Sequence, residues 1–185
     1  MELKRKYSNI QVLDIEAKGK GLAIRMAWKR SEANILSFMD ADLSSDLSFF
    51  RVLIDFVAIE GCDLVIGNRL GPKSLVISNK LLRKVASRFY NFIARLLLRT
   101  KTDDHQCGFK AMKKEAFDII EPYLKEKGFF FHTELIAVSH KKNFNIKPLD
   151  IIWRDSKESK VSLFSDSWKM FYDVIRLRRR LAQIK

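Results

Sequence analysis

The chain has 185 residues, of which 47% are hydrophobic, so it can bury the core of one ordinary domain. No apolar run reaches the roughly 18 residues that a membrane span needs, no apolar signal core follows the charged start, and two cysteines cannot form a disulfide scaffold. These features favour a cytoplasmic protein, and the formal net charge of +13 favours a polyanionic partner: nucleic acid, anionic lipid head groups or a phosphorylated substrate.

Strands and helices are predicted to alternate over the first part of the chain. The predicted elements are a strand over 9–15, a helix over 22–33, a strand over 35–39, a helix from Ser45 or Asp46 to about Glu60, and a strand over 63–66. This order is typical of a parallel sheet with right-handed crossovers.

The strand predicted over 35–39 runs directly into two aspartates, Asp40 and Asp42. In extended backbone, residues two apart project to the same face, so both carboxylates would point one way at the carboxyl end of the strand. Ligands of open α/β sheets bind at that edge. A solvated Asp-x-Asp turn is the alternative, but the apolar strand before the pair favours a Mg²⁺ or Mn²⁺ site.

Basic residues dominate the stretch from Arg69 to Lys101, which contains no Asp or Glu. Apolar residues at helical spacing predict a helix over 79–99 with a wide apolar face. One interpretation is a core helix with a solvated basic rim. We favour the other, in which the helix faces an anionic membrane surface or a phosphate-bearing acceptor.

The remaining elements continue the α/β pattern. They are a strand over 109–112, a helix over 113–125 interrupted by Pro122, a helix over 129–140, a strand over 144–153, a charged loop over 154–161 and a helix over 164–183. Pro148 restricts the last strand to a sheet edge, because proline cannot donate to the ladder.

Five short motifs occur in an order that resembles the family 2 glycosyltransferases of GT-A fold, most of all the dolichyl- or polyprenyl-phosphate mannose and glucose synthases. The motifs are Gly19–Gly21, Asp40–Leu43, Gly67–Arg69, Gln106–Lys110 and Ser159–Val161. The resemblance implies an α/β, Rossmann-like GT-A fold with a mixed, mainly parallel sheet flanked by helices. It divides the chain into a partial catalytic domain, 1–163, and a C-terminal amphipathic basic helix, 164–185.

The resemblance also assigns residues to the sugar donor. Asp40 and Asp42 match the Asp-x-Asp that holds Mg²⁺ or Mn²⁺ on the nucleotide-sugar diphosphate, and Asp42 is expected to be catalytic. Lys20, Arg154 and Lys160 match residues that bind the nucleotide sugar and its phosphates. Converging cations suit this chemistry, because transfer from a sugar diphosphate leaves a dianionic nucleotide.

A second set of residues is expected to bind the acceptor phosphate. Arg69 matches a catalytic arginine after the next strand, and Arg83 with Ser87 matches an Arg-x-x-x-Ser on the following helix. A lipid phosphate with a second pKa of about 6 is already ionised at neutral pH, so no strong general base is required. His132 stands where relatives carry an acid, and it is either a base or a structural histidine. Ser44 likewise replaces a glutamine.

Relatives open with a strand, a helix and a second strand that bind the base and ribose, and these have no counterpart before residue 9. The N-terminally truncated chain is then either an internal start, one part of a split gene, or an inactive fragment. We expect the strand at 9–15 to be an open sheet edge that accepts a partner chain or a second copy.

The expected function is transfer of a hexose from a nucleotide sugar, of the GDP-mannose or UDP-glucose type, to a polyprenyl phosphate by a peripheral enzyme at the cytoplasmic face of a membrane. A nucleic-acid-binding module is the alternative suggested by the net charge, but no reading motif accompanies it. A haloacid-dehalogenase-like enzyme is a third hypothesis, and it lacks its threonine, since Ser44 stands in that place.

Overall fold

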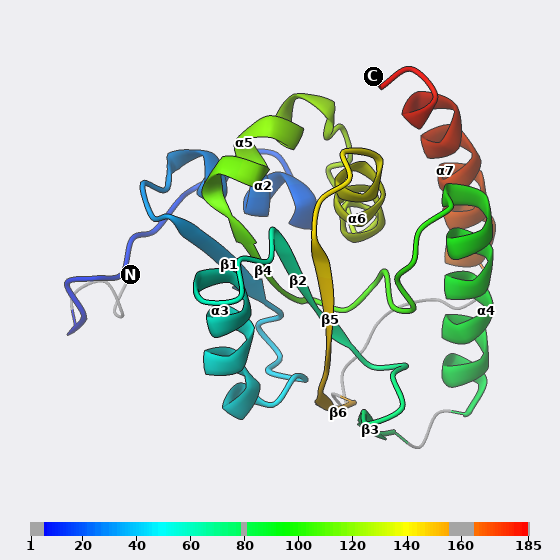
Figure 1. The fold of residues 1–185 in the computed structure, drawn as a ribbon, viewed down its shortest axis with the longest axis horizontal. Helices are drawn as coiled ribbons and strands as arrows, with labels where there is room; N and C mark the ends of the chain where they lie inside the picture. Colours follow the sequence, from blue (N-terminus) through cyan, green and yellow to red (C-terminus); the bar gives the residue numbers. More distant parts are fainter. Residues whose placement is uncertain (1–5, 79–80, 156–164, 185) are drawn as a thin grey trace.

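The computed structural model describes residues 6–78, 81–155 and 165–184. In chain order its elements are α2 (Lys20–Arg30), β1 (Ile35–Met39), the 3-10 helix η1 (Leu47–Phe49), α3 (Phe50–Ala58), β2 (Leu64–Asn68), β3 (Leu75–Ile77), α4 (Leu81–Leu98), β4 (Phe109–Lys113), α5 (Lys114–Ile120), the 3-10 helix η2 (Glu121–Tyr123), α6 (Phe131–Lys141), β5 (Ile146–Asp150), β6 (Ile152–Arg154) and α7 (Ser165–Leu181). Four strands form the main sheet in the order β1-β4-β2-β5, and β3 pairs with β6 (Figure 1).

Three strands of the main sheet run in one direction, and β4 runs against them. β4 lies between β1 and β2 and pairs antiparallel with both, whereas β2 and β5 are parallel. The mixed, mainly parallel sheet flanked by helices is therefore confirmed (Figure 1). The expected succession of adjacent parallel strands is wrong at one point: β1 and β2 are not neighbours, because β4 is inserted between them.

The strand predicted over 9–15 is wrong. The alternation that suggested it is real, since Leu13 is partly buried and Val12 is exposed, but no strand is assigned there. A strand requires a ladder partner, and no described segment pairs with 9–15. The open edge of the main sheet, expected at 9–15, is instead β1.

The elements around β1 follow local sequence signals. β1 has the predicted bounds. The helix expected from Ser45 or Asp46 begins as η1, where the Asp46 carboxylate accepts a hydrogen bond from the Ser48 N–H, and continues as α3. The helix predicted over 22–33 is α2, which ends three residues earlier, where Ser31 is extended. Trp28 is its buried side chain.

The two faces of the main sheet pack against different helices (Figure 1). Along β2, Leu64 and Ile66 face a large core shared with α2, α5, α6, α4 and α7, whereas Val65 faces a smaller core with α3. This division follows from the period of two in a strand. The sheet therefore lies between α3 on one face and a larger group of helices on the other.

Two predicted elements are interrupted in ways that the sequence explains only in part. The helix predicted over 113–125 ends at Ile120, and Pro122 lies in η2 directly after it. The strand predicted over 144–153 divides at the buried Ile151 into β5 and β6, which belong to different sheets. Pro148 lies on β5, the edge strand opposite β1, as expected. From residue 156 onward the predicted charged loop lies outside the described residues.

The C-terminal helix α7 packs against α4 and α6 (Figure 1). Arg180 of α7 forms an ion pair with the buried Glu134 of α6 and donates to the carbonyl oxygen of Tyr123 at 3.0 Å. Glu134 also accepts the backbone N–H groups of Lys125 and Glu126. Among the described residues, no helix is long and apolar enough to cross a membrane.

Candidate functional site

The carboxyl ends of β1, β2 and β5 meet the amino end of the antiparallel β4 at one edge of the main sheet. Asp40 directly follows β1, Asn68 ends β2, Asp150 ends β5 and Gly108 precedes β4. Open α/β sheets bind ligands at this edge. The candidate site is therefore built by residues that are far apart in the sequence.

Asp40 is held between α2 and the start of β4. Its carboxylate forms an ion pair with Lys20, the first residue of α2. Any side chain at Gly108 would collide with the Asp40 carboxylate, so the glycine of this motif leaves the space in which Asp40 lies. Burial would lower the pKa of Arg69, but the charge and hydrogen bonds of Asp104, together with the charge of the nearby Asp40, raise it above its usual value. Three predicted site residues, Lys20, Asp40 and Arg69, are thus brought together.

Asp42 lies in a turn, so the extended backbone that was expected to align it with Asp40 is wrong. The Leu43 N–H donates to the Asp40 carbonyl oxygen at 3.1 Å, and Leu43 has a φ of 50°. The Asp42 carboxylate accepts the Ser44 N–H at 3.1 Å. Asp residues favour such turns because their side chains satisfy nearby backbone donors. Both carboxylates nevertheless belong to one tight turn at the sheet edge.

The donor set of this turn fits a hard divalent cation. No group of three or more His, Cys, Asp or Glu side chains suited to a metal is found within the described residues. Asp40 and Asp42 supply carboxylate oxygens, Asp42 is exposed and Asp40 is partly exposed. Mg²⁺ typically takes one or two carboxylates and completes its shell with water and substrate phosphate. Two protein ligands are therefore sufficient for such a site.

Arg69 is clamped by Asp104, a residue that sequence reasoning missed. Asp104 is 0% exposed and accepts from Arg69 Nε at 2.7 Å, from Nη2 at 2.9 Å and from the backbone N–H at 3.0 Å. The guanidinium carbon also lies 5.4 Å from the Trp153 ring centre. Burial alone would raise the pKa of Asp104, but the charge and hydrogen bonds of Arg69 outweigh it and lower that pKa to about 2. Arg69 is thus a fixed, partly neutralised cation.

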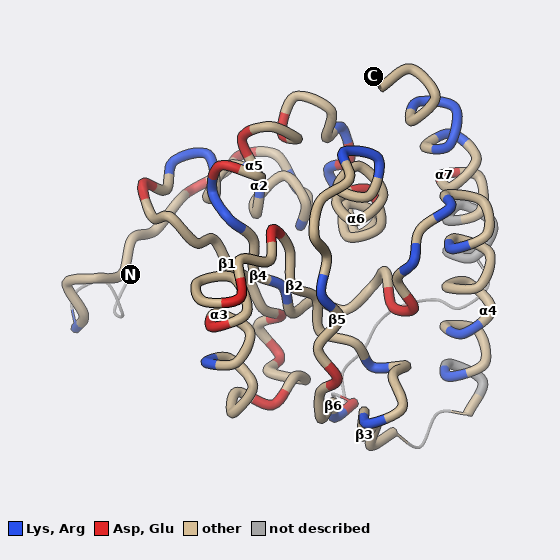
Figure 2. Tube along the Cα trace, in the orientation of Figure 1, with Lys and Arg blue, Asp and Glu red and all other residues tan. Residues whose placement is uncertain are grey.

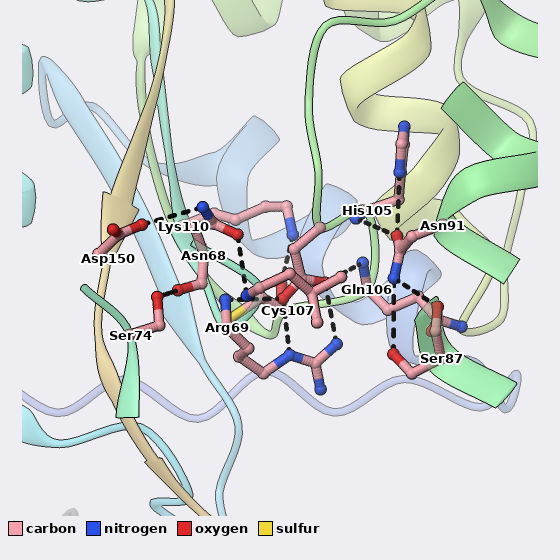
Figure 3. A network of polar contacts seen from close by, with 12 residues as sticks. Asn68, Arg69, Ser74, Ser87, Asn91, His105, Gln106, Cys107, Lys110 and Asp150 are labelled. Carbon is pink, nitrogen blue, oxygen red and sulfur yellow. Dashed lines mark hydrogen bonds and ion pairs between the residues drawn. The ribbon is translucent and has the colours of Figure 1, made fainter. Parts of the chain in front are cut away.

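A buried polar network connects this pair to α4 (Figure 3). Asn91 of α4 accepts the His105 N–H at 2.8 Å and donates to the Ser87 carbonyl oxygen at 2.9 Å. The Nε2 atom of the His105 ring lies 2.7 Å from the Thr100 hydroxyl oxygen. Burial lowers the pKa of His105 to about 4, so the ring is neutral at pH 7. Ser87, expected at the acceptor phosphate, lies at the end of this network.

The turn after β2 is fixed by Asp150. Asn68 donates to the Asp150 carboxylate at 2.9 Å, and the Lys73 N–H donates to its other oxygen at 2.9 Å. The Ser74 hydroxyl donates to the Asn68 carbonyl oxygen at 2.6 Å (Figure 3). A side chain at Gly71 would collide with the Asp150 carboxylate. These bonds determine where Arg69, the residue after Asn68, leaves the sheet.

Lys110 and His132 are buried polar groups on the inner side of the site. Lys110 donates to the Cys107 carbonyl oxygen, lies 5.9 Å from the Phe38 ring centre, and burial lowers its pKa to about 8. Burial also lowers the pKa of His132 well below its usual range. Within the described residues, neither ring nitrogen of His132 has a hydrogen-bond partner. His132 is therefore a neutral ring stacked on Phe38, 5.2 Å between centres.

The other predicted site residues are placed to different extents. Arg154 is exposed at the end of β6, and its backbone N–H donates to the Ser44 carbonyl oxygen at 2.8 Å, which brings it beside the Asp42 turn. Lys160 lies outside the described residues, and so does the side chain of Arg83.

The comparisons with known proteins agree with this geometry. The family model described as glycosyl transferase family 2 matches residues 2–120. The chain belongs to glycosyl transferase family 2, which confirms the resemblance drawn from its motifs. A relative with 30% identity is glycosyltransferase AglD of Haloferax volcanii, aligned over 85% of this chain and 25% of its own length.

Two further relatives are dolichyl-phosphate beta-glucosyltransferases. The Dictyostelium discoideum protein is 30% identical and the Saccharomyces cerevisiae protein 27% identical, each aligned over 96% of this chain. The alignments cover 56% and 57% of those proteins. The chain therefore spans little more than half the length of these relatives.

Solved structures share the GT-A-like fold at low sequence identity. Glucosyl-3-phosphoglycerate synthase of Mycobacterium tuberculosis in complex with UDP superposes with a TM-score of 0.62 at 17% identity, covering 90% of this chain and 56% of the synthase. The same enzyme with Mn²⁺, UDP and glucosyl-3-phosphoglycerate gives a TM-score of 0.63 at 16% identity, covering 91% of this chain and 57% of the synthase.

Proposed function

We propose that this chain is the larger part of a metal-dependent hexosyltransferase that moves a hexose from a nucleotide sugar to a polyprenyl phosphate at the cytoplasmic face of a membrane. The observation that carries the proposal is the Asp40–Leu43 turn at the strand ends, with Lys20 and Arg69 beside it. Dolichyl-phosphate beta-glucosyltransferases among the relatives support the lipid phosphate acceptor and a glucose donor, so UDP-glucose is the first donor to test before GDP-mannose.

On the donor side, Asp40 and Asp42 would hold Mg²⁺ or Mn²⁺. Such an ion would neutralise the negative charge of the nucleoside diphosphate leaving group. The synthase that shares the fold was crystallised with Mn²⁺ and UDP, which supports this assignment. Lys20 forms an ion pair with Asp40. If Asp40 held a metal ion, the Lys20 ammonium would be available to bind a phosphate oxygen of the donor. Arg154, at the end of β6, would bind the same diphosphate, and Lys160 is assigned to it by its motif alone.

On the acceptor side, Arg69 would orient the lipid phosphate, and Arg83 and Ser87 are assigned to the same phosphate by their motif. Because Asp104 and Trp153 hold the guanidinium in one position, Arg69 binds without losing side-chain freedom. The acceptor is its own nucleophile, since a phosphate with a second pKa of about 6 is ionised at pH 7. The buried, neutral His132 is therefore not needed as a base.

A further part of the proposal concerns the edge of the main sheet at β1. β1 is an edge strand, and such an edge presents free N–H and C=O groups to another strand. We propose that a front segment, on the same or a separate chain, pairs with β1 and carries the contacts to the base and ribose. A second copy pairing at β1 is the alternative occupant of this edge.

The test is turnover of UDP-glucose with polyprenyl phosphate and Mn²⁺, with and without a co-expressed front segment from the Dictyostelium relative. We expect the isolated chain to transfer glucose poorly and the chain with its co-expressed front segment to transfer glucose efficiently. Asp42→Asn in the chain co-expressed with its front segment should reduce turnover by about a hundredfold or more, since it removes one of two proposed metal ligands. Asp55→Asn, at a partly exposed position on α3, is the matched control and should leave turnover unchanged. Full turnover by the isolated chain would refute the need for a front segment, full turnover by the Asp42 variant would refute the metal-binding role of the turn, and no turnover with the front segment present would refute the transfer itself.

A further inference from the structure

The amino end of α2, with Lys20 as its first residue, lies against the segment that precedes α6. We call residues 124–129 the α6 entry segment. The Leu22 N–H donates to the Lys127 carbonyl oxygen at 3.0 Å. The Lys20 ammonium lies 5.4 Å from the centre of the Phe129 ring. The α6 entry segment therefore supports the turn of α2 from which the Lys20 side chain reaches the candidate site.

The two glycines on either side of Lys20 permit this close contact. Any side chain at Gly19 would collide with the backbone of Lys127, and any side chain at Gly21 would collide with the side chain of Phe131. The start of α2 is thus packed against the α6 entry segment without space between them. A displacement of that segment would therefore displace Lys20 as well.

The carboxylate of Glu134 holds the α6 entry segment in place. Glu134 is completely buried, and it accepts the Lys125 N–H at 3.0 Å and the Glu126 N–H at 2.8 Å. Residues 125–127 form neither helix nor strand, so no regular ladder satisfies their backbone donors. The Glu134 side chain therefore takes the place of such a ladder for two consecutive residues.

Arg180 of α7 compensates the charge of Glu134. Its guanidinium forms an ion pair with the Glu134 carboxylate, lies 3.3 Å from the Glu126 carboxylate and donates to the Tyr123 carbonyl oxygen at 3.0 Å. A buried carboxylate that loses its cation is strongly destabilising, because its charge is then uncompensated. The C-terminal helix thus supplies the charge that allows Glu134 to be buried beneath the α6 entry segment.

Helical geometry selects this arginine from its neighbours. Figure 2 shows Lys and Arg gathered over the last turns of α7. Arg178 and Arg179 are exposed, whereas Arg180 is partly buried. At about 100° of rotation per residue, positions four apart share a face, and Arg176 pairs with Glu126 at 2.6 Å on that same face. Two arginines of α7 therefore complement the carboxylates beside the α6 entry segment.

We infer that Arg180 is a positioning residue for the donor site, and that it acts on Lys20 through Glu134 and the α6 entry segment. This inference rests on the proposed function, in which Lys20 binds a phosphate oxygen of the nucleotide sugar. Arg180 itself touches neither the donor nor the metal in this scheme. A misplacement of about 1 Å in a group that orients a reactant can cost on the order of a hundredfold in rate. The C-terminal helix is thereby a working part of the donor site.

A purely structural role for Arg180 makes a different prediction. If Arg180 only stabilised the fold, its loss and the loss of Lys20 would act independently, and their effects on donor affinity would add. If Arg180 acts through Lys20, its effect on donor affinity disappears once the Lys20 ammonium is gone. A double-mutant cycle on these two residues therefore separates the two roles.

The test is calorimetry of UDP with Mn²⁺ on the full chain in two backgrounds. Arg180→Met should weaken UDP binding several-fold in the wild-type background but by less than about twofold in the Lys20→Met background. Arg179→Met removes the same charge from an exposed position of α7, and as the matched control it should change the affinity by less than about twofold in either background. Equal losses from Arg180→Met in the two backgrounds would overturn the inference.

A second variant reaches the same contact without leaving an uncompensated charge. Glu134→Gln weakens the hold on the α6 entry segment, while Arg180 keeps the Glu126 carboxylate and the Tyr123 carbonyl oxygen as partners. Circular dichroism verifies that each variant is folded, and Glu134→Gln replaces Arg180→Met where the latter does not fold. It should lose UDP affinity in the wild-type background and not in the Lys20→Met background. Wild-type UDP affinity in Glu134→Gln would also overturn the inference.

Amide hydrogen exchange tests the contact without any ligand. In Arg180→Met, the amides of Leu22, Lys125 and Glu126 should exchange about tenfold or more faster relative to the amides of β2, which report global stability. Arg179→Met should leave that ratio unchanged. An unchanged ratio in Arg180→Met would overturn the positioning role whether or not UDP binds. Faster exchange without UDP binding by the wild-type chain would support the positioning of α2 and refute the proposed donor site.

Discussion

Two ion pairs at the same sheet edge differ in almost every respect except their charges. Arg69 and Asp104 are joined by three hydrogen bonds, and Asp104 is completely buried. Lys20 and Asp40 share one contact, and their side chains remain 24% and 36% exposed. A buried pair whose partner is removed leaves an uncompensated charge, whereas a partly exposed pair exchanges its partner for water or ligand at little cost. The first pair therefore holds Arg69 in one position, whereas the second can exchange its partner for a ligand.

The largest expected effect comes from breaking the buried pair. Asp104→Ala leaves the Arg69 guanidinium buried without its carboxylate, and it should lower the free energy of unfolding by about 3–5 kcal/mol. Urea denaturation monitored by circular dichroism measures this. Asp103→Ala, which removes the partner of the exposed Arg95, is the control and should cost less than about 1 kcal/mol. Similar losses for the two variants would mean that Asp104 is not the scaffold we describe.

The same pair predicts a direction for acid unfolding. Because the pKa of Asp104 is lowered to about 2 in the folded chain, its contribution is complete above the ordinary value of 3.8 and is lost as the pH falls from there towards 2. The Asp104 variant lacks this contribution, so its stability difference from wild type should shrink over that window.

Lys110 sharpens the comparison, because it is a buried cation for which no ion pair is found among the described residues. Burial lowers its pKa from 10.5 to about 8, so the folded chain binds fewer protons than the unfolded chain between these values. Its stability relative to Lys110→Met should therefore be lowest below pH 8 and rise by about 3 kcal/mol by pH 10.5. Paired denaturation curves at pH 7 and pH 10 measure the change. A difference that is independent of pH would show that Lys110 is neutralised by another group.

Much of the local structure could be predicted because its causes are local. The apolar run at 35–39 between polar residues is β1, Asp46 caps η1, and Pro148 marks an edge strand. The basic helix predicted over 79–99 is α4, which the structure describes from Leu81 to Leu98. In each case the hydrophobic pattern of a short segment, or a single residue, determines the local backbone conformation.

The rest depends on pairing between distant segments, which local patterns do not encode. The alternation at 9–15 predicts a strand, yet a strand forms only with a ladder partner. β4 is inserted between β1 and β2 although it follows them by more than forty positions in the sequence. In the sequence Asp104 is one of two adjacent aspartates, and no neighbouring residue indicates that Arg69 is its partner. The motifs predicted which sheet edge carries the candidate site, and they did not predict the buried pair that holds Arg69 there.

The smallest expected effect on stability comes from breaking the exposed pair, and here ligand binding is the informative measurement. Lys20→Met should change the free energy of unfolding by less than about 1 kcal/mol, because Asp40 remains partly solvated. The freed Asp40 carboxylate should bind Mn²⁺ alone a fewfold more tightly, since no ammonium competes with the cation. Nucleoside diphosphate with Mn²⁺ should bind several-fold more weakly, because Lys20 no longer reaches a phosphate oxygen. Calorimetry with Mn²⁺, and then with UDP and Mn²⁺, measures these opposite shifts, and Lys29→Met on the same helix is the control. If both affinities fell together, Lys20 would be positioning Asp40 rather than competing for it, and the two pairs would be more alike than their exposure indicates.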